Sequence, residues 1–312
     1  MTVTAAHRAI VFSFPEVDAA ATLHVTFHRT LRVPDDAITY GLPPSLGRLD
    51  VRATHEVDPR GRQESDAMLP LWQSEATWID FTAPDDYPFL VKVGVGGINA
   101  ITGDAYTPAP DFVTEDYLEV PTQPWLDGFR VDATTVRQFV AMPLGDGYSA
   151  AEQLTGTDDG LIRFSVVPLK ADVWAQRPRP VAFLAEDMCI PAPAGMGLGA
   201  GGSIQQSIAT PIEPHENWAL DARTEARIRL VNSAVWQSIT GEAPHRKPLT
   251  VDEYLAYGFP WFEWYDDSLA RQGESPLNAV KTIRQIGEEK GANPLPDNTS
   301  FTPPTPHIVG GV

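Results

Sequence analysis

Residues 120–156 read VPTQPWLDGFRVDATTVRQFVAMPLGDGYSAAEQLTG, and this stretch is the most tightly specified part of the chain. It holds a Pro-Trp turn, an apolar run interrupted by Arg137 and Gln138, a Gly-x-Gly turn and a helix start. Ser149 and Glu152 have the spacing of a capping box, and Gly156 is placed to end the helix. We therefore expect β-structure to lead into this stretch and short helices to pack back onto it.

Alternating apolar and polar residues predict strands on both sides of it. Leu23, Val25 and Phe27 alternate with polar residues, which is the period of a half-buried strand. The run 88–95 continues through two glycines into 98–102, a pattern typical of a hairpin. Further strands are predicted at 76–83, 161–169, 181–185 and 227–232.

Helix signals concentrate in the last third of the chain. Thr250 and Glu253 form a second capping box. Ser275-Pro276 predicts the start of the longest helix, which would run to Gly291. The segment 186–203 is crowded with Pro and Gly and shows no periodicity, which is typical of a long loop.

These patterns predict an α+β fold. We expect a mainly antiparallel, sandwich-like β core over 1–185, a Pro/Gly-rich mobile loop over 186–203, an α-rich segment over 204–291 that packs on the core, and a disordered tail over 292–312.

Composition excludes several classes of partner. The 312 residues include 23 basic and 41 acidic side chains, for a net charge of −18, so nucleic acid and anionic membrane are poor partners. The single cysteine, Cys189, allows no intrachain disulfide. The sequence lacks a signal-peptide pattern and a long apolar run, so we expect a soluble, cytoplasmic protein.

Several phrases resemble a family of uncharacterised, mainly bacterial proteins. They are QSEA-x-W (73–78), KVG (92–94) with INA-x-TG (98–103), QPWLDG (123–128), VRQFVAMPLG-x-GY (136–148) with QLTG (153–156), and PWF-x-x-YD (260–266). The resemblance covers roughly residues 30 to 290 and implies a shared fold. It implies no activity.

Three motifs suggest chemistry but lack the required context. Gly197–Gly202 matches G-x-G-x-x-G with Asp221 downstream, yet no strand and helix flank it as a dinucleotide site requires. His24 and His28 would lie about 13 Å apart on a strand, too far for one metal ion. The sequence shows no base next to Cys189 that could activate it as a nucleophile. We therefore predict no cofactor and no metal.

One group of polar residues interrupts the predicted core. The candidates for catalytic chemistry are Glu75, Asp80, Lys92 and Arg137, and the candidates for ligand binding are Asn99, Gln138, Trp125 and Trp261. A buried charge must be paired, so these residues form either a polar cleft or a structural ion-pair network. The aromatic run 258–266 is either a core anchor or, if one face stays exposed, a partner site.

Two functional hypotheses remain open. The first is a non-catalytic binding or assembly protein that takes a protein partner, another copy of itself or a small polar ligand. The second is a metal-independent enzyme for a small polar substrate, with Glu75 or Asp80 as acid or base and Arg137 or Lys92 stabilising charge.

Overall fold

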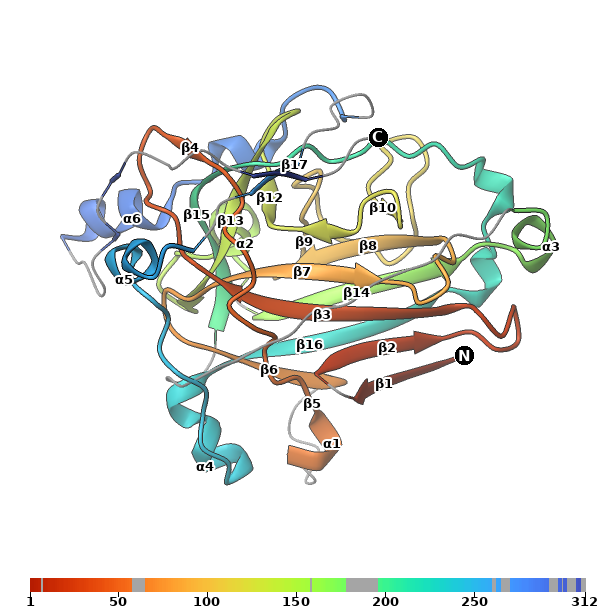
Figure 1. Ribbon diagram of the computed structural model, residues 1–312, viewed down its shortest axis with the longest axis horizontal. Coiled ribbons are helices and arrows are strands. Elements are labelled where there is room, and N and C mark those ends of the chain that lie inside the picture. The colour runs from red at the N-terminus through yellow and green to blue at the C-terminus, as the bar shows by residue number, and fades with distance from the viewer. Residues whose placement is uncertain are drawn as a thin grey trace.

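A computed structural model describes residues 1–6, 8–57, 65–157, 159–177, 196–259, 262–264, 270–291, 297–298, 300–301 and 307–309. Within these ranges the chain forms two large sheets, mostly antiparallel, and a small third one. The two large sheets cross the centre of Figure 1, and short helices lie around them. The coarse prediction of a β-rich α+β fold is confirmed.

The larger sheet has nine strands among the described residues. Along its main path they are β1 (Thr2–Ala6), β2 (Ala9–Ser13), β3 (Thr22–Thr30), β7 (Ala76–Thr82), β13 (Thr135–Pro143), β15 (Met196–Gln205) and β4 (Thr39–Tyr40). Two short strands add to it: β11 (Trp125–Leu126) pairs with β7, and β12 (Gly128–Arg130) pairs with β13.

The second sheet has seven described strands. They follow the order β10 (Leu118–Val120), β8 (Phe89–Val95), β14 (Leu161–Pro168), β16 (Thr224–Asn232), β6 (Ala67–Leu71) and β5 (Arg52–Ala53), with β9 (Ile98–Asn99) paired to β8. The small third sheet joins β17 (Phe262–Trp264) and β18 (His307–Val309) in parallel.

Apolar side chains from the two large sheets meet in one core. The ring of Phe164 on β14 lies 6.0 Å from that of Phe27 on β3 and 6.4 Å from that of Phe81 on β7. Phe14 and Phe89 make a similar contact at 5.9 Å. Burial of large aromatic rings is a strong stabilising contribution, so these contacts join the sheets face to face.

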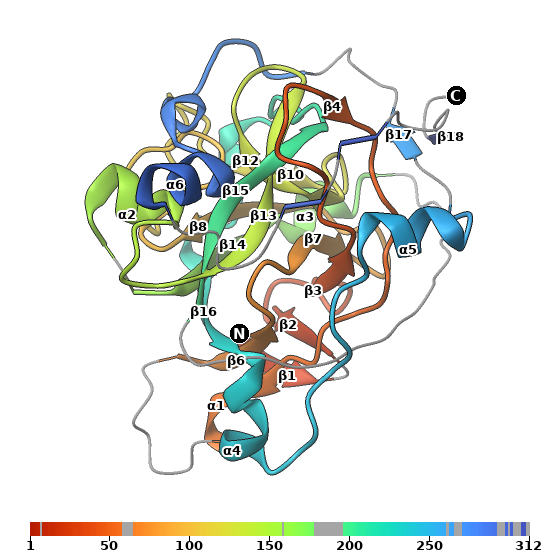
Figure 2. The same ribbon diagram turned by 90° about the vertical axis from the view of Figure 1, so that its left-hand side faces the viewer.

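The helices are short and lie at the edges. They are α1 (Thr54–Val57), α2 (Ala150–Thr155), α3 (Ala171–Trp174), α4 (Trp236–Thr240), α5 (Val251–Ala256) and α6 (Ile283–Lys290), with 3₁₀ turns η1 (His215–Asn217), η2 (Leu220–Ala222), η3 (Ser233–Val235) and η5 (Pro276–Ala279). Figures 1 and 2 place α2, α5 and α6 at one end of the sheets and α1 and α4 together at one side. No described helix is long and apolar enough to cross a membrane.

The prediction of an α-rich segment over 204–291 is wrong. This segment contributes β16 to the second sheet, where it lies between β14 and β6, and its helices are short. The long helix expected from Ser275 to Gly291 is interrupted because Val280 is extended and Thr282 begins a new helix with its own capping box to Gln285.

The predicted loop over 186–203 is also corrected where it is described. Residues 196–203 belong to β15, which pairs with β13 on one side and β4 on the other. The glycines permit close packing: a Cβ on Gly202 would lie 2.2 Å from the carbonyl oxygen of Pro34. Residues 186–195 and the predicted strand 181–185 lie outside the described residues.

Candidate functional site

Glu75 lies at the centre of a buried charged cluster just before β7. Its Oε1 accepts a hydrogen bond from Arg29 Nε at 2.5 Å, and its Oε2 lies 3.0 Å from His245 Nε2. The backbone N–H of Trp72 donates to the same Oε2 at 2.9 Å. Burial opposes ionisation of Glu75, but His245 and Arg29 lower its pKa below the usual range. The cluster ties the segment around residue 245 to the core.

Lys92 on β8 is fully buried and belongs to a different cluster. Its Nζ forms an ion pair with Asp116 and donates hydrogen bonds to Thr107 Oγ1 at 3.1 Å and Ala109 O at 2.7 Å. These partners occupy the three donors of the ammonium group. Lys92 therefore holds the loop between β9 and β10 against the second sheet.

Two amide candidates also serve as internal supports. Gln138 on β13 accepts from the N–H of Val33 and donates to the carbonyl of Leu31, and its side chain is fully buried. Asn99 donates to the carbonyl of Asp116 and accepts from the N–H of Ile101. Each amide satisfies backbone groups of an irregular segment that would otherwise be unpaired.

The remaining candidates are placed as follows. Trp125 on β11 is half-buried and supplies a hydrogen bond to the side chain of Asp127. Burial raises the pKa of Asp127 to about 7 against the opposing effect of that hydrogen bond. Oδ2 of Asp127 has no hydrogen-bond partner in the described part of the chain. Trp261 and Cys189 lie outside the described residues.

Asp80 lies on β7 beside two threonines. Its Oδ2 accepts hydrogen bonds from Thr82 Oγ1 at 2.7 Å and Thr26 Oγ1 at 3.2 Å. Burial raises the pKa of Asp80, and these hydrogen bonds counteract the rise. Asp80 is thus held apart from Glu75, Lys92 and Arg137, each of which has other partners.

Arg137, unlike Glu75, Asp80 and Lys92, lines the pocket beside η5 and α6. The guanidinium is half-buried and donates a hydrogen bond to the carbonyl of Val280. Among the described residues Arg137 forms no salt bridge; burial lowers its pKa, and the negative charge of Asp35 opposes that decrease. The pocket has a volume of about 380 Å³, and its polar walls include Arg137, Asn278, Lys281, Gln285, Glu288 and Glu289.

Both signs of charge line this pocket. Lys281 Nζ lies 2.7 Å from both carboxylate oxygens of Glu289, and these side chains are more than half exposed. Gln285 uses its Oε1 to accept from the N–H of Thr282, so the group it can offer a ligand is the amide nitrogen. The arrangement can hold a small polar molecule whose anionic end meets Arg137.

The described residues contain no group of three or more His, Cys, Asp or Glu side chains that could hold a metal ion. His24 and His28 both lie on β3, as the spacing argument required, and His28 is stacked on Trp78 at 4.1 Å. Neither residue joins a metal cluster within the described ranges.

Arg29 and His245 are important polar residues that sequence reasoning missed. They come together with Glu75 over sequence separations of 46 and 170 residues, and no local pattern signals such a contact. The residues 278–281 that line the Arg137 pocket were missed because the sequence predicted a continuous helix there. The Thr282-x-x-Gln285 capping box was the available signal that the helix restarts.

No protein-family model, no curated protein and no solved structure matches this chain.

Proposed function

We propose that the chain is a binding protein for a small molecule that carries a carboxylate, and that Arg137 holds the carboxylate in the pocket beside α6. The observation that supports this is a half-buried guanidinium at the wall of a pocket of about 380 Å³, which forms no salt bridge among the described residues and feels the charge of Asp35 only from beyond salt-bridge distance. A guanidinium forms strong, geometrically specific hydrogen bonds with a carboxylate.

The acidic residues at the pocket narrow the class of ligand. Glu288 pairs with Arg284 at 3.7 Å and Glu289 with Lys281 at 2.7 Å, and their exposed oxygens can still accept hydrogen bonds from a ligand ammonium group. A ligand with a carboxylate at one end and an ammonium group at the other meets both requirements. We therefore propose a small zwitterion of the size of an amino acid in preference to a dicarboxylate.

The test is calorimetric titration of the full chain with the proteinogenic amino acids and with succinate as the dicarboxylate. We expect at least one amino acid to bind and succinate not to bind. Arg137→Met should weaken binding at least tenfold, because a charged hydrogen-bond partner is lost. Arg137→Lys should retain part of the affinity, since it keeps the charge but not the forked donors.

The matched control is Arg163→Met. Arg163 is also a half-buried arginine on a strand, but it pairs with Asp159 and does not line the pocket. This variant should bind like the wild type. Absence of binding by every amino acid, or equal affinity in Arg137→Met and wild type, would overturn the proposal.

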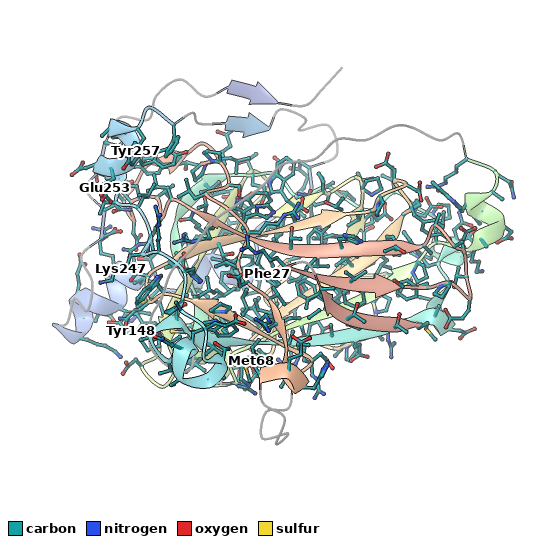
Figure 3. All side chains as sticks on the ribbon, turned by 60° about the horizontal axis from the view of Figure 1, so that its bottom comes forward. Phe27, Met68, Tyr148, Lys247, Glu253 and Tyr257 are labelled. Atoms are coloured by element: carbon teal, nitrogen blue, oxygen red, sulfur yellow. The ribbon has the colours of Figure 1, made fainter. Side chains whose placement is uncertain are left out.

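A second candidate function is assembly through α5. Among the exposed apolar side chains, Tyr257 is 67% exposed, Leu255 39% and Phe259 37%, and the rings of Tyr257 and Phe259 lie 5.5 Å apart. Figure 3 shows Tyr257 beside Glu253 at the end of the molecule formed by α5. Contiguous exposed apolar side chains favour contact with a protein partner or a second copy.

Light scattering after size-exclusion chromatography tests this second candidate. If the α5 residues form the contact, the wild type is larger than a monomer and Tyr257→Ser returns it to monomer. The exposed apolar residue Ile212 is 63% exposed and lies elsewhere, so Ile212→Ser is the matched control and should not change the mass. A monomeric wild type would rule out self-association through α5.

The enzyme hypothesis with a Glu75, Lys92 and Arg137 cleft receives less support. Glu75 pairs with Arg29 and His245, and Lys92 pairs with Asp116, so the three proposed groups have separate partners. General acid–base chemistry requires a group within hydrogen-bond reach of a substrate. The pocket at Arg137 includes neither Glu75 nor Lys92.

A further inference from the structure

A continuous chain of hydrogen bonds runs from an exposed serine to a half-buried carboxylate on the outer side of β3 and β7. Ser45 Oγ lies 2.7 Å from His28 Nδ1, and His28 Nε2 lies 3.0 Å from Thr26 Oγ1. Thr26 Oγ1 in turn donates to Asp80 Oδ2 at 3.2 Å. The four residues come from β3, β7 and the loop after β4.

The direction of the protons in this chain follows from Asp80. An ionised carboxylate only accepts, so the single hydroxyl proton of Thr26 points to it and Thr26 must accept from His28 Nε2–H. A neutral imidazole with a proton on Nε2 has an unprotonated Nδ1. His28 Nδ1 therefore accepts from the hydroxyl of Ser45.

The backbone N–H of Gly47 donates to Ser45 Oγ at 3.0 Å, which agrees with this direction. A serine oxygen can accept one hydrogen bond while it donates its own proton. Ser45 therefore donates its hydroxyl hydrogen bond to an unprotonated imidazole nitrogen, which is the arrangement required of an activated nucleophile.

The loop that carries Ser45 is fixed to β3. The N–H of Leu46 donates to Arg29 O at 2.8 Å, and the N–H of Arg29 donates to Gly47 O at 2.7 Å. Thr30 Oγ1 donates to the carbonyl of Pro43. Ser45 itself is exposed, whereas His28 and Thr26 are buried. A substrate can thus reach the hydroxyl, while the base behind it stays oriented.

We propose that Ser45 is a nucleophile activated by His28 and that the chain hydrolyses short carboxylic esters at this site. Ser45 and His28 are the catalytic residues, and Thr26 and Asp80 are positioning residues that fix the tautomer of His28. The inference does not depend on the Arg137 pocket, because it uses none of its residues.

The proposed reaction has two steps. Ser45 Oγ bonds to the ester carbonyl carbon as its proton passes to His28 Nδ1, and the bond to the alcohol oxygen then breaks as that oxygen takes the proton. Water next attacks the acyl-serine, gives its proton to His28 Nδ1, and releases the carboxylic acid as Ser45 Oγ takes the proton back. Each step returns His28 to its neutral form.

The surroundings of His28 set the strength of this base. Burial, aided by the charge of Arg48, lowers the pKa of His28 to about 4, so the imidazole is unprotonated at neutral pH. An imidazole with this pKa is unprotonated at neutral pH but is a weak base. We therefore expect slow turnover.

The test treats the full chain with an alkyl fluorophosphonate, which forms an Oγ–P bond on an activated serine and releases fluoride. Intact mass and peptide mapping should show one adduct on Ser45, and p-nitrophenyl acetate should be hydrolysed above background. Ser45→Ala should abolish both signals. Ser238→Ala is the matched control, since Ser238 is also exposed but donates to a backbone carbonyl.

Variants at Thr26 separate activation from folding. Thr26→Val keeps the shape but removes the link between His28 and Asp80, so the labelling rate should fall at least tenfold. Thr26→Ser restores the hydroxyl and should recover the rate, while thermal unfolding checks that each variant is folded. No adduct on the folded wild type, labelling that persists in Ser45→Ala, or equal rates in Thr26→Val and wild type would each overturn the proposal.

Discussion

Replacement of Asp127 by asparagine should change how stability depends on pH. Asp127 is buried between β11 and β12, and its Oδ2 has no hydrogen-bond partner among the described residues. Burial raises the pKa of this carboxyl to about 7 from an ordinary value of 3.8. Because the folded-state pKa is the higher one, ionisation of Asp127 disfavours the folded state.

The sign of the effect on stability, and the pH range over which it develops, follow from the pKa values of Asp127 in the folded and unfolded states. Below about pH 4 the carboxyl is protonated in both states and has no effect on the free energy of unfolding. As the pH rises to about 7, the unfolded state loses this proton first and the folded state becomes less stable. The full effect is about 4 kcal/mol as an upper limit, at the ordinary conversion of pKa to free energy.

The assay is urea unfolding of the wild type and Asp127→Asn at several pH values from 5 to 8. The stability of the variant relative to the wild type should increase by about 2–3 kcal/mol over this range, because the amide does not ionise. Asp132→Asn is the control, as that side chain accepts from Thr134 N in an exposed turn. Parallel pH profiles for Asp127→Asn and wild type would show that ionisation of Asp127 does not destabilise the folded state.

Three further substitutions test individual contacts. Glu75→Gln should lower the free energy of unfolding by about 3–5 kcal/mol, because it leaves the buried Arg29 without its counter-charge. The control is Glu56→Gln, in the exposed pair with Arg52, which should lower it by less than about 1 kcal/mol. Similar denaturant midpoints for the two variants would contradict this prediction. Gly202→Ala should lower stability by about 1–3 kcal/mol through overpacking against Pro34, so an unchanged melting temperature would argue against a strand there. Ser149→Ala should lower stability by about 1 kcal/mol by removing a helix cap, and denaturant unfolding with no loss would count against that cap.

Local patterns predicted the elements whose signals are local. The alternation at Leu23, Val25 and Phe27 lies within β3, and the two-glycine turn joins β8 to β9 as expected. The capping boxes at Ser149 and Thr250 begin α2 and α5. In each case, the residues that determine the element are within a few positions of each other.

Contacts between distant segments could not be predicted in the same way. The glycine-rich run 196–203 forms a strand because β13 and β4 supply hydrogen-bond partners on both sides, and glycine allows close approach to Pro34. The partners of Glu75 and Lys92 were mispredicted for a related reason. A buried charge requires a counter-charge, but the sequence does not specify which one.

The candidate site was predicted only in part. Arg137 was predicted as a catalytic candidate that stabilises charge, and it lies at the wall of the pocket beside α6. The pocket exists because the chain leaves helical geometry between η5 and α6, and Val280 and Lys281 then line it. The site therefore depends on a helix interruption that apolar periodicity alone does not reveal.

Calorimetric titration of amino acids into wild type and Arg137→Met determines whether the Arg137 guanidinium holds the carboxylate of a ligand. We expect saturable binding of an amino acid to the wild type, at least tenfold weaker binding to Arg137→Met and unchanged binding to Arg163→Met. Binding that is indifferent to Arg137, or no binding by any amino acid to the folded wild type, would contradict it.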